Sequence, residues 1–260
     1  MKISGIKQNL DLAKFDKDGY IVVKNVLTDG QLATYRAACE SMFQKKYLEF
    51  NDGKVIPGWA GRLREIGTLN NLHKHPRLIT IVSTILGPDW VYAQHSDLHE
   101  NKITNWHTDI LPERLSHFQD KDPYDPGYKI IKICILLQDH SNNEHGLWMR
   151  PGSHKVRANK FKNKGGDEFE DVCIKSGPKD AVVFDQKVMH RGQLSQYRDI
   201  YGANRYLITY GYGLNNIYTN QHAAGTIYRQ NQQRFEIAKN NGKAAWSKSV
   251  NSNPGGDVEI

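Results

Sequence analysis

A series of short segments rich in β-branched and aromatic residues, separated by turns, begins at Trp90 and restricts this chain to a small group of folds. The expected strands lie at residues 90–98, 103–109, 129–137, 146–150, 171–175, 181–186 and 205–213. Short strands at such spacing are typical of antiparallel sandwiches and jelly rolls. We therefore expect a mainly β fold with a jelly-roll core and flanking helices packed on one side of it.

The N-terminal third predicts helices around a single strand. Residues 20–26 (YIVVKNV) predict the strand, and Thr28 and Gln31 then have the spacing of a capping box that opens a helix. A second helix is expected over residues 76–86, because Pro stands at its first position and a Gly-Pro pair ends it. These elements form a helical lead-in to the β core.

One domain is the expected organisation, because the chain shows no internal repeat and no linker-like stretch. We divide residues 1–260 into a helical lead-in over about 1–89, a β core over about 90–213, and a C-terminal helix and tail over 214–260. The last helix is expected near residues 226–239. With 38% hydrophobic residues, 5 Trp, 13 Tyr and 8 Phe, the chain can bury a real core, which argues against a disordered protein.

The composition also bears on the compartment. No stretch approaches the roughly 20 apolar residues of a membrane span, and residues 1–19 lack the apolar segment of a secretion signal. The three cysteines, Cys39, Cys134 and Cys173, are too few and too scattered for a disulfide framework. We expect a cytoplasmic protein.

The net charge of +7 arises from 35 basic and 28 acidic residues spread along the chain. Such a charge can attract nucleic acid, a membrane surface or a small anion. No basic arm and no nucleic-acid-binding motif accompanies it. We expect a small-molecule partner and no nucleic acid, and the sequence leaves the oligomeric state open.

Candidate metal ligands stand in the segment Asn105–Asp109 (NWHTD). Residues two apart on a strand face the same way, so His107 and Asp109 would converge on one point. One more histidine would complete a two-histidine, one-carboxylate face, which suits Fe(II). An isolated His-x-Asp pattern is also common by chance, as a surface histidine beside a solvated carboxylate.

Three later features favour a metal site over a chance surface pattern. Residues 146–154 (GLWMRPGSH) predict a strand that enters a tight turn, and residues 180–185 (DAVVFD) predict a buried strand that leads to His190. Arg205 opens the strand RYLITY, where a buried guanidinium requires an anion.

In this order, the motifs resemble the phytanoyl-CoA dioxygenase family of Fe(II)/2-oxoglutarate oxygenases. The lead-in is similar as well, in residues 15–23 (FDKDGYIVV) and in the stretch from His75 to Asp89. The resemblance covers residues 15–213 and implies a double-stranded β-helix, a squashed barrel related to the cupins. It also implies that Fe(II), 2-oxoglutarate and O2 are used, with ascorbate as an in vitro reductant.

The resemblance assigns roles residue by residue. His107, Asp109 and His190 would bind iron, and Arg205 would hold the distal carboxylate of 2-oxoglutarate, with Arg198 as a rival in a loop-like stretch. The family often has Ser or Thr two residues after the distal histidine, but this chain has glycine at that position. The second contact to the carboxylate must come from elsewhere, and the candidates include Lys132, Gln94 and Thr104, with Tyr92 and Cys134.

Other polar residues leave alternatives open. Lys132 interrupts an apolar strand, so it either points inward to an anion or lies on an edge strand facing water. An anionic substrate could bind Arg62, Arg64 and Arg150, which could equally be solvated surface charges. Solvent exposure is the better expectation for a further group of histidines: His73, His75, His117, His140, His145 and His222.

The reaction implied by the resemblance is hydroxylation of a small polar, preferentially anionic metabolite, with release of succinate and CO2. Asp109 fills the place that related halogenases leave to chloride, which favours hydroxylation, while desaturation and epimerisation stay open. The alternative outside the family is a non-catalytic jelly-roll protein that binds a ligand.

Overall fold

The computed structural model describes residues 10–45, 47–50, 53–57, 69, 72–110, 122, 124–156, 169–192, 202–240 and 243–245. Its helices are α1 (Leu12–Asp18), α2 (Asp29–Lys45), α3 (Pro76–Leu86) and α6 (Ile217–Lys239), with 3-10 turns η1 (Leu72–Lys74) and η4 (Ser153–Lys155). Its strands are β1 (Tyr20–Val23), β2 (Tyr47–Phe50), β3 (Gly53–Pro57), β4 (Trp90–Tyr92), β5 (Asp97–Glu100), β6 (Ile130–Leu136), β7 (Trp148–Met149), β8 (Val172–Cys173), β9 (Ala181–Asp185), β10 (His190–Arg191), β11 (Tyr206–Leu214) and β12 (Lys243–Ala245).

The described strands form a large and a small sheet. The large sheet has the order β1-β9-β6-β11-β5-β3-β2-β12, with β4 also paired to β11, and the small sheet has the order β10-β7-β8. The pairs are antiparallel apart from β12 with β2. The crossovers between strands that are distant in sequence agree with the expected double-stranded β-helix, a mainly β core with flanking helices.

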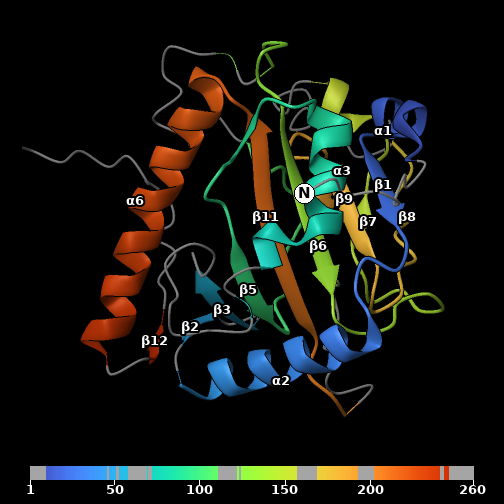
Figure 1. Ribbon diagram of the computed structural model, residues 1–260. Helices are drawn as coiled ribbons and strands as arrows, with labels where there is room; N and C mark the ends of the chain where they lie inside the picture. The colour runs from blue at the N-terminus through green and yellow to red at the C-terminus, as the bar shows by residue number, and fades with distance from the viewer. Residues whose placement is uncertain are drawn as a thin grey trace, which may run out of the picture.

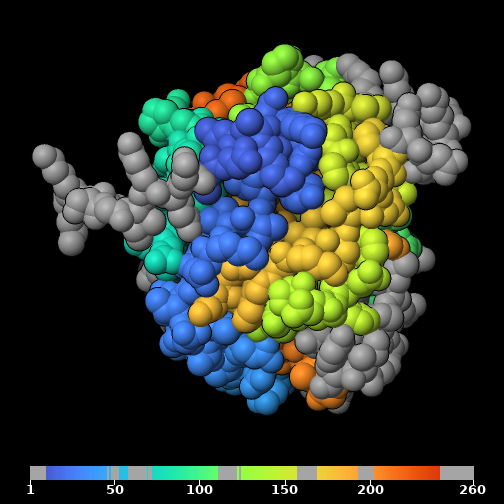
Figure 2. All heavy atoms as spheres, turned by 90° about the vertical axis from the view of Figure 1, so that its right-hand side faces the viewer, coloured from blue at the N-terminus to red at the C-terminus, as the bar shows by residue number. Residues whose placement is uncertain are grey.

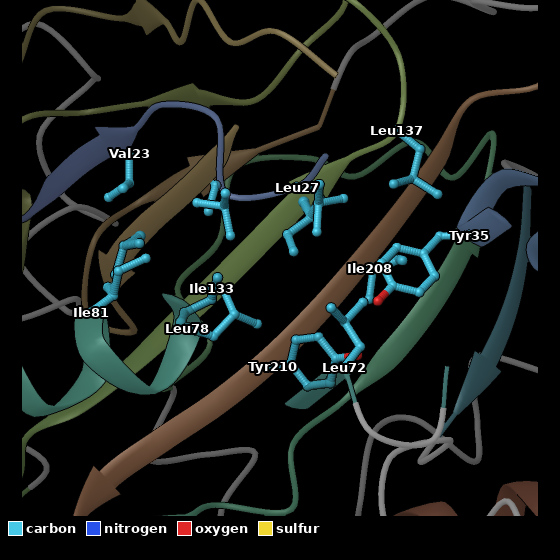
Figure 3. Packing of buried hydrophobic residues seen from close by; sticks show 14 of the residues in the cluster. Val23, Leu27, Tyr35, Leu72, Leu78, Ile81, Ile133, Leu137, Ile208 and Tyr210 are labelled. Atoms are coloured by element: carbon cyan, nitrogen blue, oxygen red, sulfur yellow. The ribbon is translucent and has the colours of Figure 1, made fainter. Parts of the chain in front are cut away.

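The two faces of the large sheet carry different side chains, as strand β6 shows. Ile131, Ile133 and Ile135 pack with residues of α2 and α3, whereas Cys134 and Leu136 pack with Met149 of the small sheet. Figure 3 shows the helix-facing layer, in which Leu78 and Ile81 of α3 approach Ile133 and other sheet residues. The molecule therefore has helices, large sheet and small sheet in successive layers, and the second face of β6 points into the interior between the sheets.

The helices surround this sheet on different sides. In Figure 1, α3 lies in front of β6 and β9, α2 crosses one end of the sheet, and α6 stands along the side where β12 and β2 lie. Figure 2 shows α1 and β1 (blue) beside the gold segment that contains β9, in agreement with the pairing of β1 with β9. No helix in the described ranges is long and apolar enough to cross a membrane.

Several local predictions are confirmed. The Thr28 amide donates to Gln31 Oε1 at 2.9 Å and the Gln31 amide donates to Thr28 Oγ1 at 3.2 Å, which is a capping box. α3 begins at Pro76 and is followed by Gly87 with φ 82°. The last helix begins nine residues earlier than the predicted 226, because Asn216 accepts from the Thr219 amide and caps it there.

Two predicted strands differ from the structure. The stretch 90–98 is divided into β4 and β5 by Gln94, whose φ of 57° interrupts an extended chain. The stretch 103–109 pairs only at His107, which forms an isolated bridge with His190. The lead-in supplies more of the sheet than predicted, since β2 and β3 join it in addition to β1.

Candidate metal centre

The side chains of His107, Asp109 and His190 lie close together, because an isolated β-bridge joins residue 107 to residue 190. One possible ligand atom from each side chain lies within 4.8 Å of the other two. The Asp109 carboxylate lies between the imidazoles, with Oδ1 3.9 Å from His107 Nε2 and Oδ2 3.9 Å from His190 Nε2. Backbone hydrogen bonds of 3.0 and 2.9 Å between His107 and His190 fix the two rings, whose centroids are 4.3 Å apart.

The hydrogen bonds of the two imidazoles select the tautomer that a metal requires. His107 Nδ1 lies 2.7 Å from the Asn105 carbonyl, and His190 Nδ1 lies 2.9 Å from the Val188 carbonyl. A carbonyl oxygen can only accept, so each Nδ1 carries the proton and donates it. In the neutral form of each ring the lone pair is then on Nε2, the atom that faces Asp109, and a backbone carbonyl holds each ring in the orientation of a metal ligand.

Lys132 is the basic neighbour of this triad. It lies on β6 between β9 and β11 and is only 7% exposed, so the alternative of an edge strand facing water is wrong. Its Nζ lies 2.9 Å from Asp109 Oδ2. Burial would raise the pKa of Asp109, but the adjacent Lys132 ammonium holds it well below 3.8. The carboxylate is thus in the ionised form that binds metal.

The donor set suits a divalent iron ion. Burial, and then the neighbouring His107, lowers the pKa of His190 to about 3, so this imidazole is neutral at physiological pH. Two neutral imidazole nitrogens and one carboxylate on one side are the ligands of non-haem Fe(II) oxygenases and leave coordination positions for other ligands. The residues present therefore fit the ion that the sequence predicts.

Arg205 and Thr104 both approach Gly192, two residues after His190, Arg205 through its contact with the Lys102 carbonyl. Arg205 is 3% exposed, and its Nη2 donates to the Lys102 carbonyl while its backbone amide donates to Asn101 Oδ1 at 2.8 Å. The amide of Gly192 donates to Thr104 Oγ1 at 2.7 Å, and a Cβ added to Gly192 would lie 3.1 Å from that hydroxyl. The Thr104 hydroxyl thus occupies the space that a side chain at position 192 would take.

The remaining predicted residues are more dispersed. Gln94 is tied to α6, since its carbonyl accepts from Gln230 Nε2 at 3.0 Å. Arg150 follows Met149, the partner of His190 in the small sheet, and its Nε donates to Asp171 Oδ1 at 2.7 Å. Its guanidinium lies over the ring of Trp106, 4.4 Å from the centroid. Three other predicted arginines lie outside the described residues: Arg62, Arg64 and Arg198.

The sequence did not reveal a chain of buried polar groups that joins the core to α6. Tyr128 Oη lies 3.2 Å from His222 Nδ1, and His222 Nε2 lies 3.2 Å from His95 Nδ1. His95 packs over Gly211, where an added Cβ would lie 3.0 Å from the histidine Cβ. In the sequence, only the helical spacing of His222 from the buried Thr219 and Thr226 could have indicated that this histidine lies on the buried face of α6.

The expectation of exposed histidines is wrong for three residues. His73, His140 and His222 are buried, although each stands in a polar or turn-like stretch of sequence. Their positions depend on elements that pack over them from elsewhere in the chain, as α6 does for His222.

Comparison with known proteins places these features in a family. The family model of phytanoyl-CoA dioxygenase (PhyH) matches residues 15–195. The ectoine dioxygenases of Streptomyces avermitilis and Stutzerimonas stutzeri are 22% and 26% identical over 56% and 55% of this chain. These matches cover 51% and 49% of the relatives, so the chain spans about half the length of the curated relatives it matches.

Solved structures share the fold. EctD from S. alaskensis with bound Fe has a TM-score of 0.60 and 17% identity, over 82% of this chain and 79% of that chain. HygX from Streptomyces hygroscopicus, with nickel, 2-oxoglutarate and hygromycin B bound, has a TM-score of 0.58 and 19% identity, over 81% and 88%. The double-stranded β-helix expected from the sequence is therefore confirmed. Because the family model matches well over half of the 260 residues, the chain belongs to the phytanoyl-CoA dioxygenase (PhyH) family.

Proposed function

We propose that this protein is an Fe(II)- and 2-oxoglutarate-dependent dioxygenase that hydroxylates a small polar metabolite, with succinate and CO2 as the other products. The observation that carries the proposal is the triad of His107, Asp109 and His190, whose ligand atoms lie within 4.8 Å of one another. The carbonyl contacts at both Nδ1 atoms support it, because they prepare both Nε2 atoms for a metal.

Each residue of the site has a defined task in this proposal. His107, Asp109 and His190 would bind the iron, which together with 2-oxoglutarate and O2 supplies the oxidising chemistry. Arg205 would bind the distal carboxylate of 2-oxoglutarate, since a planar guanidinium matches a carboxylate with two parallel hydrogen bonds. Thr104 would add a hydroxyl contact to the same carboxylate, in place of the side chain that Gly192 lacks.

Lys132 contacts a metal ligand. Its 2.9 Å contact with Asp109 supports a role in orienting the carboxylate ligand rather than in holding the cosubstrate. Such a residue acts through Asp109 and is a positioning residue.

The ligand set favours hydroxylation over halogenation. Desaturation and epimerisation use the same ligands, and the presence of a carboxylate at position 109 speaks only against halogenation. A non-catalytic jelly-roll ligand-binding protein would not require two oriented imidazoles beside an ionised aspartate.

We also propose a cytoplasmic location and small-molecule partners. The thiols of Cys39, Cys134 and Cys173 are unpaired, which suits a reducing compartment. The relatives are named for ectoine, a small molecule, and ectoine is therefore the first compound to test as a substrate.

The test is succinate release in air from purified protein supplied with Fe(II), ascorbate and 2-oxoglutarate, with and without ectoine. We expect slow succinate release without substrate and its loss in Asp109→Ala. Glu144→Ala, a carboxylate change outside the triad, is the matched control. Equal succinate release from wild type and Asp109→Ala would contradict the proposal.

A further inference from the structure

Asp97 is a buried carboxylate that the proposed reaction does not use. It opens β5 on the interior face, and its backbone amide donates to Thr209 Oγ1 of β11 at 3.0 Å. The residue is 7% exposed, and its Oδ1 has no hydrogen-bond partner among the residues that the structure describes. A carboxylate oxygen is costly to bury unless a donor meets it.

The other oxygen of Asp97 faces a chain of donors. His95 Nε2 lies 3.9 Å from Asp97 Oδ2. The Nδ1 of His95 is contacted by His222 Nε2 at 3.2 Å, and His222 Nδ1 by the Tyr128 hydroxyl at 3.2 Å. If Tyr128 donates, each imidazole accepts at Nδ1 and donates at Nε2, so the chain of N–H groups ends at Asp97 Oδ2. At 3.9 Å the last contact is longer than a hydrogen bond, so His95 faces Oδ2 without saturating the carboxylate, and Oδ1 is left for another donor.

A guanidinium from α6 lies next to this carboxylate. Arg229 Nη2 is 3.7 Å from Asp97 Oδ2, which is an ion pair but longer than a hydrogen bond. The Arg229 side chain is 29% exposed, whereas that of Asp97 is 10% exposed, so the positive group lies nearer to solvent than the negative one. Arg229 Nη1 also donates to Gln233 Oε1 at 3.4 Å, one turn along the helix.

The pair lies close to the metal centre. His95 packs over Gly211, whose partner on β6 is Lys132, and Lys132 Nζ lies 2.9 Å from Asp109 Oδ2. Thr209, which accepts from the Asp97 amide, pairs with Cys134 on the same strand, two residues from Lys132. A molecule bound at Asp97 and Arg229 would lie beside the iron site.

We propose that Asp97 and Arg229 bind the two charged groups of a small zwitterionic substrate. This inference rests on the proposed function and names the substrate class of that site. The Asp97 carboxylate accepts hydrogen bonds from the ammonium or amidinium of the substrate at Oδ1, and the Arg229 guanidinium binds its carboxylate. The negative group that the sequence led us to expect in the substrate is thereby accompanied by a positive one, as in an amino acid.

The alternative for these two residues is a structural ion pair that ties α6 to β5. A structural pair would be expected to approach within hydrogen-bond distance and to satisfy both carboxylate oxygens. The 3.7 Å separation and the buried Oδ1 without a partner favour a pair that separates to receive a ligand.

The test is equilibrium binding to the protein loaded with Ni(II) and 2-oxoglutarate, which excludes turnover. The probes are the common amino acids and ectoine, and for each amino acid its cationic carboxamide and its anionic N-acetyl derivative. We expect at least one zwitterion to bind, and its two derivatives to bind at least tenfold more weakly. Asp97→Asn should weaken the zwitterion at least tenfold while it weakens the N-acetyl derivative far less.

The second variant and the control complete the experiment. Arg229→Gln should reduce the preference for the zwitterion over its carboxamide, and Arg229→Lys should restore part of it. Glu100→Gln is the matched control, because Glu100 is on the same strand, is ion-paired with Lys54 at 2.8 Å and lies on the other face of the sheet. If Asp97→Asn does not fold, the partly exposed Arg229 carries the test.

Three results would overturn the inference. These are equal binding of a zwitterion and its N-acetyl derivative, unchanged binding in both Asp97→Asn and Arg229→Gln, and no binding by any zwitterion of the panel. Binding of 2-oxoglutarate to the Ni(II) protein is measured first. Its failure counts against the proposed function, whereas its success without zwitterion binding counts against this inference alone.

Discussion

Single contacts set the protonation and orientation of the metal ligands. The carbonyl oxygens of Asn105 and Val188 place the ring protons on Nδ1 of His107 and His190. Both contacts are two residues away in sequence, so they follow from the local course of the chain. The contact between Lys132 and Asp109 is different, because it joins β6 to a segment more than twenty residues before it.

Lys132 and a metal ion should compete for Asp109. In Lys132→Met the buried carboxylate loses its cation, which should cost the metal-free protein about 3–5 kcal/mol of unfolding free energy. Binding of Fe(II) or Ni(II) supplies a new cation, so it should stabilise the variant more than it stabilises the wild type. Thermal unfolding with and without metal measures this difference.

The control for this prediction is Lys129→Met, because Lys129 stands just before the same strand and donates to the Ile85 carbonyl away from the triad. An equal gain in melting temperature on metal addition for wild type and Lys132→Met would show that the ammonium does not influence the metal site.

His140 should make stability depend on pH. It is buried and neutral, with Gln138 Nε2 3.1 Å from its Nε2 and Asn143 Oδ1 2.9 Å from its Nδ1, and burial lowers its pKa to about 4. Between pH 6.5 and about 4 the unfolded chain binds a proton that the folded protein does not. The free energy of unfolding is therefore unaffected by His140 above pH 6.5. As the pH falls from 6.5 to about 4, this residue should lower it by on the order of 2–3 kcal/mol.

Urea unfolding at pH 7 and pH 4.5 checks this dependence. The loss of unfolding free energy between pH 7 and pH 4.5 should be smaller in His140→Gln than in the wild type. His145→Gln, a change at a nearby half-buried histidine, should leave this loss unchanged. An equal loss of unfolding free energy in the wild type and in His140→Gln would show that His140 is not the source of the pH dependence.

At the scale of elements, α6 can pack closely on the core because two positions of β11 are glycines. A Cβ added to Gly213 would lie 2.4 Å from Thr219 Oγ1 and 2.9 Å from Ile130 Cγ1. Glycine at this position therefore allows the first turn of α6 to lie on β11, and at Gly211 it makes room for His95. These close approaches bring Arg229 to Asp97.

Gly213→Ala should consequently destabilise the protein. Thr219 is fully buried and has little room to move, so overpacking should cost about 1–3 kcal/mol. Gly30→Ala in α2 is the matched control, since nothing lies within 4 Å of its added Cβ and alanine favours the helix. Denaturant unfolding of both variants measures the effect, and equal stability of the two would show that the contact of α6 with β11 is loose.

The sequence predicted elements best where their signals are local. The capping box at Thr28 and the Gly-Pro end of the second helix are visible within a few residues, and the strands β6, β9 and β11 are rich in β-branched and aromatic residues. β10 has two residues, which is too short for any periodic pattern. The backbone of His107 pairs only with His190, so the predicted strand at 103–109 has no ladder to extend it.

For the whole molecule, the ordered motifs predicted the fold and a triad whose members the structure brings together. The link from Tyr128 through His222 to His95 was not predictable, because His95 and His222 are 127 residues apart and no periodic signal joins them. The same holds for Asp97 and Arg229, which depend on how α6 packs on the sheet. Arg150 looks like a surface charge in the sequence, but its side chain is only 13% exposed, pairs with Asp171 and lies 4.4 Å from the ring of Trp106.

The central claim is that the triad and Arg205 bind Fe(II) and 2-oxoglutarate together, and anaerobic titration of 2-oxoglutarate into the Fe(II) protein tests it most directly. The account predicts a visible absorption band of the Fe(II)–2-oxoglutarate chelate in the wild type. The band should be absent in Asp109→Ala and should require at least tenfold more 2-oxoglutarate in Arg205→Gln, because the distal carboxylate loses its charged partner. No band in the iron-loaded wild type, or an unchanged band in Asp109→Ala, would contradict the account.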